Sequence, residues 1–257
     1  MSEKIKDADI ELIMDFASFW FKFKPYSYQK RFLEACLGHP RVVGRWPRQS
    51  GKSQTVAVYV LFKALTGKNQ ILIVAPTQSQ SKELYEKIRQ MAQDNPMIRD
   101  TITKDSETEM KFENGSRIIS LPCGPFGQTI KGYTADIVIL EESGILKDMI
   151  VNTVIIPMIA SKGIHGQIIK IGTPWTKNHF YDSCFNDKDY SVIKVAWPEV
   201  VEAGQYSLKF IEEQKKKLLD IEFRTEYEVE FLSDLGMFFS GELIDESQMD
   251  YHLIKII

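Results

Sequence analysis

Apolar and polar residues follow one another along the chain in blocks that predict a regular succession of helices and strands. Apolar residues recur at helical spacing between positions 10 and 20, and a second helix fits Tyr28–Leu37, which Gly38 and Pro40 end. Short apolar runs then have the length of buried strands: Arg41–Gly44, Gln70–Ala75, Asp136–Leu140, Gln167–Ile171 and Ser191–Val195. Helical patterns lie between several of them: Ser53–Thr66, Gln78–Asp94, Lys147–Ala160 and Asn178–Phe185.

This alternation predicts an α/β fold in which helices cover both faces of a mostly parallel sheet. One segment departs from the rhythm, because Glu109–Phe112 and Arg117–Leu121 flank Asn114-Gly115, a pair typical of tight hairpins. We therefore expect one antiparallel hairpin at the edge of the sheet. The stretch Ser207–Phe231 is rich in charged residues and predicts a helix with a solvated face.

Composition narrows the class of protein. A chain of 257 residues with 44% hydrophobic and 26% charged residues suits one large globular domain, or one domain with a small appendage. Its net charge of −3 argues against a uniformly basic nucleic-acid coat but leaves room for a local basic groove. The N-terminus does not resemble a signal peptide, and no apolar run approaches the roughly 20 residues that span a bilayer. Cysteines that lie far apart argue against a disulfide framework or structural zinc: Cys36, Cys123 and Cys184.

A phosphate-binding loop is indicated where the first predicted strand meets the next helix, at Gly51-Lys52-Ser53. In such a loop, backbone N–H groups surround phosphate oxygens, the lysine reaches the β- and γ-phosphates, and the serine hydroxyl binds Mg²⁺. The strict motif requires a glycine where this chain has Trp46, and a bare Gly-Lys-Ser is common. Arg48 is either a surface charge or a cation that contacts the γ-phosphate.

An acidic pair, Glu141-Glu142, ends the apolar strand Asp136–Leu140. In a nucleotide-hydrolysing enzyme, the first carboxylate at such a strand end holds Mg²⁺ and the second activates the attacking water. Adjacent like charges are costly without a cation, so the pair implies a divalent metal ion, although two solvated carboxylates are the plain alternative. Glu141 is one methylene longer than the usual aspartate, which places the metal slightly farther out.

Together these motifs resemble the ATPase domain of the large terminase subunit of tailed viruses, the motor that packages DNA into a preformed capsid. The family's loop has the form RQxGK[ST], which Arg48–Ser53 matches without the early glycine. The segment Tyr26–Phe32 resembles the family's adenine-recognising segment, in which Gln29 would read the base. The resemblance implies the following nucleotide-binding residues: Gln29, Arg48, Gln49, Ser50, Gly51, Lys52, Ser53 and Gln54.

The resemblance also assigns roles elsewhere. It implies that Glu142 activates water, Arg48 stabilises developing charge, and Ser53 and Glu141 hold Mg²⁺. Lys131 stands where the family has an arginine finger that reaches a neighbouring subunit, and its alternative is an exposed lysine without a catalytic role. A strand that ends in the family's coupling motif matches these residues: Gly172, Thr173 and Pro174. The following Asn178–Tyr181 matches as well.

The resemblance implies a P-loop NTPase of the ASCE, RecA-like type with a small lid-like helical subdomain. We expect an ATPase domain over 1–235, with its core at about 38–200 and a lid from 1–37 and 201–235, before a linker or tail at 236–257. About 18 residues follow Phe239, too few for the family's nuclease domain, and their acidic residues are too terminal for a two-metal site: Asp245, Glu246 and Asp250.

The function implied is ATP hydrolysis coupled to translocation of double-stranded DNA, with ATP and Mg²⁺ in the site. Expected partners are the portal protein of the procapsid, the small terminase subunit and further copies in a ring, without a membrane, in the host cytoplasm. Two alternatives stay open: a nucleotide-binding switch or assembly module with little hydrolysis, and a helicase-like DNA-dependent ATPase. A weaker hypothesis, non-specific DNA binding, rests on a few basic residues: Lys22, Lys24, Lys30 and Arg31.

Overall fold

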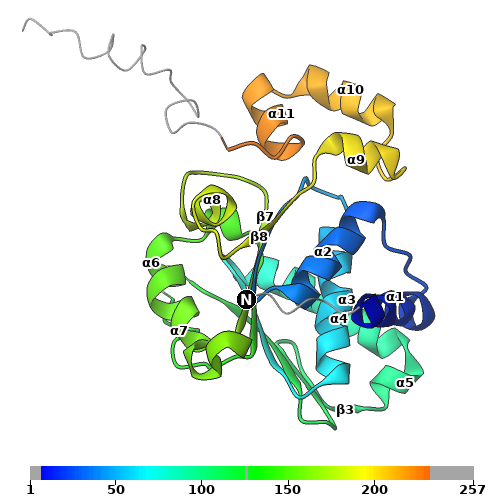
Figure 1. Ribbon diagram of the computed structural model, residues 1–257, viewed down its shortest axis with the longest axis vertical. Coiled ribbons are helices and arrows are strands. Elements are labelled where there is room, and N and C mark those ends of the chain that lie inside the picture. Colours follow the sequence, from blue (N-terminus) through cyan, green and yellow to red (C-terminus); the bar gives the residue numbers. More distant parts are fainter. Residues whose placement is uncertain (1–6, 125–126, 232–257) are drawn as a thin grey trace, which may run out of the picture.

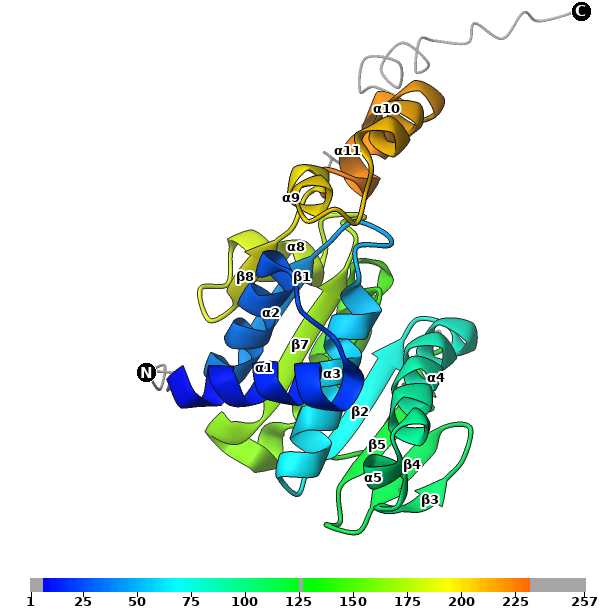
Figure 2. The same cartoon turned by 90° about the vertical axis from the view of Figure 1, so that its right-hand side faces the viewer.

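A computed structural model of the protein describes residues 7–124 and 127–231. In these residues a sheet of eight strands has the order β3-β4-β5-β2-β6-β7-β1-β8 (Figures 1 and 2). Every neighbouring pair from β5 to β8 is parallel, which confirms the expected α/β sheet. The strands are β1 (Arg41–Arg45), β2 (Gln70–Ala75), β3 (Ile102–Asp105), β4 (Glu109–Phe112), β5 (Arg117–Pro122), β6 (Ile137–Leu140), β7 (Gln167–Gly172) and β8 (Ser191–Lys194).

Helices cover both faces of the sheet because successive residues of its central strands point to opposite sides. In β2, Ile71 and Ile73 pack into one apolar cluster, and Leu72 and Val74 pack into another on the opposite face. The first face carries α1 (Asp7–Phe21), α2 (Ser27–Gly38), α3 (Lys52–Thr66), α4 (Gln78–Asp94) and α5 (Pro96–Arg99) (Figure 1). The second face carries α6 (Asp148–Ile150), α7 (Ile156–Met158) and α8 (His179–Phe185).

The strand order brings three chain segments to one end of the sheet. β7 lies between β6 and β1, so the residues that follow these parallel strands meet at the same edge. In open α/β sheets this edge, at the carboxyl ends of the strands, is where ligands bind. The predicted phosphate-binding loop follows β1, the acidic pair follows β6, and the predicted coupling motif ends β7 and follows it.

The antiparallel hairpin is confirmed, and its turn has Gly115 at a φ of 84°. The edge strand, however, is β3, which pairs with β4 and which the apolar pattern did not reveal because most of its residues are exposed. β5 is an interior strand that also pairs in parallel with β2. At this edge Glu109 accepts hydrogen bonds from Lys104 and Arg117. Burial alone would raise the pKa of Glu109, but these two cations hold it at about 2.

Two predicted helices are less regular than expected. The segment predicted as one helix over Lys147–Ala160 has α6, a π-helical stretch at Val151–Ile155 and α7 in succession, followed by 3-10 turns at Ala160–His165. Pro157 accounts for part of this, since it lacks the N–H that a regular helix needs.

The segment predicted as helix over Ser207–Phe231 forms two helices, α10 (Leu208–Lys217) and α11 (Asp220–Glu226). Leu218 and Leu219 between them are extended, and the N–H of Leu219 donates to the Glu222 carboxylate, which starts the new helix.

The helices after β8 lie beyond the carboxyl end of the sheet (Figures 1 and 2). They are α9 (Trp197–Glu202), α10 and α11, and α9 contacts α2 through an ion pair of 2.6 Å between Arg31 and Glu199. α1 and α2 pack against α3 in the main apolar cluster. The division into a core and a lid stays a prediction, and the predicted tail at 236–257 lies outside the described residues. No helix of the described chain is long and apolar enough to cross a membrane.

Candidate active site

The loop between β1 and α3 adopts an unusual backbone conformation at two residues. Gln49 has a φ of 55° and Gly51 a φ of 79°, both in the left-handed region. A Cβ atom on Gly51 would lie 2.4 Å from Nε2 of Gln29, which is itself 1% exposed in α2. Glycine is therefore required at position 51 for its conformation and for the close approach of Gln29.

The carbonyl groups of this loop, from Trp46 to Gly51, all have hydrogen-bond donors. In chain order these donors are Thr173 Oγ1, Ser50 Oγ, Tyr206 OH, Gln205 Nε2, Tyr28 OH and both the amide and hydroxyl of Thr55. Within residues 7–124 and 127–231, by contrast, no acceptor bonds the amide N–H groups of Gln49, Ser50 and Gly51. A loop with its carbonyl groups bonded and its N–H groups free is arranged to receive an anion.

The acidic pair lies opposite this loop and contacts its lysine. Nζ of Lys52 is 3.0 Å from Oε1 of Glu142 and 4.0 Å from Oε1 of Glu141. Burial raises the pKa of Glu141 to about 7, although Lys52 opposes this. Burial alone would lower the pKa of Lys52, but the two carboxylates outweigh it and raise that pKa above its ordinary value. The lysine and both carboxylates thus form one coupled charge cluster.

The residues predicted to hold Mg²⁺ fit a hard cation. Oε2 of Glu141 is buried and has no hydrogen-bond partner within the described chain. Ser53 lines the same cleft as both acidic residues and adds a hydroxyl oxygen. Carboxylate and hydroxyl oxygens are ligands that Mg²⁺ accepts, and a buried carboxylate oxygen without a partner is costly unless a cation meets it.

These residues line a cleft of about 580 Å³. It brings together most of the predicted site, namely Arg48, Gln49, Gly51, Lys52, Ser53, Gln54, Glu141 and Glu142. Its remaining walls come from α4, from the turn after β6 and from the turn after α9, none of which sequence motifs indicated: Gln80, Glu83, Leu84, Lys87, Ile145 and Gln205. The amide of Gln54 donates to Sδ of Met91 in α4. Ser50, within the loop, is fully buried, and its hydroxyl donates to the carbonyl of Pro47.

Two predicted catalytic cations, Arg48 and Lys131, are exposed. The side chain of Arg48 is 73% exposed, and its Nε lies 2.7 Å from a carboxylate oxygen of Glu226 in α11. Lys131 is exposed and is not among the residues that line the cleft. The loop arginine is therefore paired with the helices beyond the sheet, and the proposed action of Lys131 on a neighbouring subunit stays a prediction.

The predicted coupling residues touch both the phosphate-binding loop and the acidic turn. Trp46 N donates to the carbonyl of Gly172 over 3.1 Å. A Cβ atom on Gly172 would lie 2.9 Å from the amide nitrogen of Ser143, directly after the acidic pair. Pro174, two residues after Gly172, is buried. The end of β7 thus packs between the two chemical groups of the site, with no space for a larger residue at position 172.

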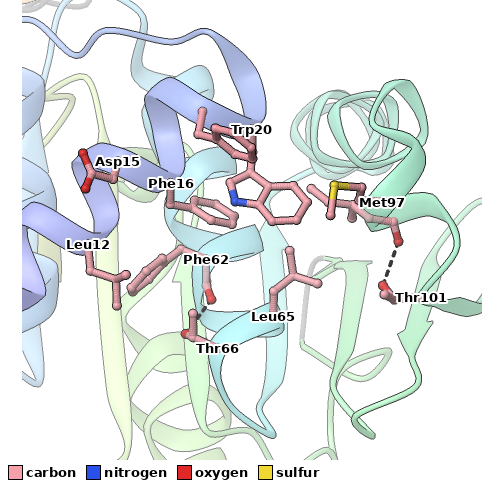
Figure 3. A pocket seen from close by; sticks show the side chains of 11 residues that line it. Leu12, Asp15, Phe16, Trp20, Phe62, Leu65, Thr66, Met97 and Thr101 are labelled. Atoms are coloured by element: carbon pink, nitrogen blue, oxygen red, sulfur yellow. Dashed lines mark hydrogen bonds between the residues drawn. The ribbon is translucent and has the colours of Figure 1, made fainter.

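A second hollow of about 510 Å³ lies between α1, α3 and α5 (Figure 3). Apolar side chains dominate its walls, with Trp20 and Met97 side by side over Phe62 and Leu65 (Figure 3). Asp15 is the one charged residue among those that line it. It lacks the cations and paired carboxylates that phosphate chemistry requires, so the cleft beside Lys52 is the candidate active site.

Comparisons with known proteins give one family model and several solved structures of similar fold. The family model described as terminase large subunit, T4likevirus-type, N-terminal, matches residues 45–246. The large terminase ATPase domain of Thermus phage P74-26 aligns with a TM-score of 0.72 and 20% identity over 85% of this chain and 98% of that one. A comparison with curated proteins gives no match.

Longer solved structures align over about half of their length. The HK97 bacteriophage large terminase has a TM-score of 0.74 and 15% identity, covering 90% of this chain and 56% of that one. The large terminase of a thermophilic bacteriophage, in complex with ADP, has a TM-score of 0.60 and 11% identity, covering 86% of this chain and 53% of that one. At these identities the solved structures support the fold, and the family model supports the membership.

Proposed function

The chain belongs to the terminase large-subunit family, T4likevirus-type, N-terminal, and from that premise we propose that it is an ATP-hydrolysing motor module that drives double-stranded viral DNA into a procapsid. The observation that carries the proposal is the phosphate-binding loop, whose free N–H groups share a cleft with Lys52 and the acidic pair. A solved relative is described as an ATPase domain, and another was crystallised with ADP and with ATP-γ-S, which supports ATP as the ligand.

In the proposed reaction each side chain of the cleft has one task. The loop amides and Lys52 bind the phosphate oxygens, so Lys52 exchanges its contact with Glu142 for the nucleotide. Glu142, released from Lys52, accepts a hydrogen bond from the attacking water and orients it. Ser53 and Glu141 would hold Mg²⁺, which neutralises phosphate charge when it is bound. Gln29 lies directly behind Gly51, on the side from which α2 approaches the loop.

Arg48 lines the cleft while its Nε is paired with Glu226. A guanidinium group can stabilise charge that develops on the transferred phosphoryl group, but here it is ion-paired with α11. Nucleotide binding and the contact between loop and α11 therefore compete for the same side chain. Together with Gly172, Thr173 and Pro174, which contact the loop and the acidic turn, this competition is a route by which hydrolysis could move the helices beyond the sheet.

The assembly around this module is part of the proposal. Double-stranded DNA, the portal protein, the small terminase subunit and further copies of the chain in a ring are the proposed partners, in the host cytoplasm. The large terminases of HK97 and of the thermophilic bacteriophage are about twice as long as the aligned region, so activities of whole relatives, a nuclease among them, are not assigned to this chain.

The test is phosphate release from ATP with Mg²⁺ over a range of protein concentrations. We expect wild-type protein to turn over, Glu142→Gln to bind ATP without hydrolysis, and Lys52→Ala to lose both. Glu113→Gln, at an exposed residue outside the cleft, is the matched control for loss of a carboxylate. Phosphate release by wild-type protein no faster than by Glu142→Gln would refute hydrolysis and favour a nucleotide-binding switch.

A further inference from the structure

Glu142, which carries the second carboxylate of the acidic pair, has an energetically unfavourable backbone conformation. Glu142 has φ 49° and ψ 45°, a left-handed conformation that costs a non-glycine residue about 1 kcal/mol or more. The chain then makes one 3-10 turn, Ser143–Ile145, with local bonds from the amides of Ile145 and Leu146. A strained residue followed by a single short turn needs support from elsewhere, because so short a turn has little stability of its own.

Asn178 supplies part of that support from the segment after β7. Its Nδ2 donates to the carbonyl of Gly144 over 2.7 Å and lies 3.4 Å from the carbonyl of Leu146. Its Oδ1 accepts the amide of Phe180 and so caps α8. One side chain therefore joins the first turn of α8 to two carbonyl groups of the turn that follows Glu142.

His179 holds the same turn from the next position. Its ring Nε2 lies 3.1 Å from the carbonyl of Leu146, and its amide donates to Asp148 over 2.7 Å. Burial and the nearby charge of Lys170 lower the pKa of His179 to about 3, so the ring is neutral near pH 7 and Nε2–H is its donor to the carbonyl. This contact does not depend on pH in the range where the enzyme would work.

The opposite side of the turn is closed by β7 and the residue after it. A Cβ atom on Gly144 would lie 2.5 Å from the carbonyl oxygen of Thr173. Nζ of the buried Lys170 donates to the hydroxyl of Ser183 over 2.7 Å and to the carbonyl of His179 over 3.3 Å, which fixes α8 to β7. The turn is thus confined between the end of β7 and the start of α8.

We propose that Asn178 and His179 are positioning residues that hold the turn after Glu142 and thereby fix the direction of its carboxylate for hydrolysis. The proposal rests on the proposed function for its catalytic consequence. Neither residue lines the nucleotide cleft, so each acts through the backbone of Gly144 and Leu146. Because the same segment follows the predicted coupling residues, a shift of the end of β7 would reorient Glu142 without any contact to the nucleotide.

Substitutions at Asn178 and His179, with a matched control, separate a positioning role from a general loss of stability. Asn178→Ser retains a side-chain acceptor for the cap of α8 but is too short to donate to Gly144. Asn95→Ser is its matched control, because Asn95 likewise caps a helix, α5, and donates to a distant carbonyl, that of Trp20, away from the cleft. At position 179, Ala removes the donor to Leu146, whereas Gln keeps an amide donor and should restore it.

Hydrogen exchange of the nucleotide-free protein tests the support itself. We expect the amides of Ile145 and Leu146 to exchange at least 10-fold faster in Asn178→Ser than in wild-type protein, and unchanged in Asn95→Ser. Steady-state hydrolysis tests the consequence: kcat should fall about 10- to 100-fold in Asn178→Ser and in His179→Ala, with KM for ATP within about 2-fold and recovery in His179→Gln.

The outcomes are separable. Unchanged exchange at Ile145 and Leu146 would overturn the proposal, as would faster exchange with an unaltered kcat. An equal loss of kcat in Asn95→Ser would mean that general destabilisation causes the loss, and it would also overturn the proposal. Wild-type protein without hydrolysis would refute the proposed function and the catalytic consequence, and exchange would still decide whether Asn178 holds the turn.

Discussion

Glu141 is a buried carboxylate whose charge conflicts with its surroundings, so its replacement gives a quantitative test. The residue is 6% exposed, one carboxylate oxygen has no hydrogen-bond partner in the described chain, and Lys52 approaches it only to 4.0 Å. Glu141→Gln removes the charge and keeps nearly the same shape. Lys52 retains its contact of 3.0 Å with Glu142 in this variant, so the change does not leave the lysine buried alone.

The size of the expected stability change follows from the pKa of Glu141. In the folded chain the pKa of Glu141 is about 7, against an ordinary value of 4.5, because burial disfavours the charged form. Below pH 4.5 the group is protonated in both states and contributes nothing. Between pH 4.5 and 7, Glu141 ionises only in the unfolded chain, so the free energy of unfolding falls by about 1.4 kcal/mol per pH unit as the pH rises. Above pH 7 the loss is complete, at about 3 kcal/mol.

Glu141→Gln should therefore be as stable as wild-type protein near pH 4.5 and more stable by about 3 kcal/mol at pH 8. The assay is urea denaturation, followed by circular dichroism at several pH values without nucleotide or metal, with Glu113→Gln as the exposed control. A variant that is less stable at pH 8, or a difference that does not grow with pH, would refute the argument that burial sets this pKa. The same variant should bind Mg²⁺ and ATP more weakly, as expected if the buried Glu141 carboxylate serves to hold the metal ion.

The remaining predictions concern packing, the loop and the edge of the sheet. Gly144→Ala should lower the free energy of unfolding by about 1–3 kcal/mol in urea denaturation, because its Cβ would meet the backbone of Thr173; an unchanged value would contradict this close approach. Tyr28→Phe should cost about 1–2 kcal/mol and weaken ATP binding in titration calorimetry, since the carbonyl of Ser50 loses its donor, and unaltered binding would show that the loop does not depend on this bond. Glu109→Gln should lower Tm by a few degrees at pH 7, and by progressively less as the pH falls from 4.5 toward 2. The reason is the low pKa of the Glu109 carboxyl: burial raises this pKa, but two neighbouring cations lower it more strongly. A Tm difference that is independent of pH would refute this.

Local patterns predicted the parts of the site that depend on neighbours in sequence. The strand before Gly51 and the strand before Glu141 were visible as apolar runs; Gly51 follows its strand after a loop of five residues, and Glu141 follows its strand directly. The missed parts depend on packing between distant segments. Gln205 bonds the carbonyl of Gln49 across 156 positions, and Glu226 pairs with Arg48 from α11, for which no contact with the loop was predicted. Such contacts are set by how helices lie against the sheet, which spacing along the chain does not encode.

The order of strands in the sheet also determines when, during translation, each strand can pair with its neighbours. β1 is among the first strands to be made, yet its two neighbours are β7 and β8, and Gln167 follows Arg45 by about 120 residues. At about 5–20 residues per second, roughly 6–24 s pass before this strand can acquire its first partner in the sheet. Throughout that interval the loop lacks the strand that supports it. The cleft that holds Lys52 and the acidic pair can therefore form only after β7 has been made, well into synthesis of the described chain.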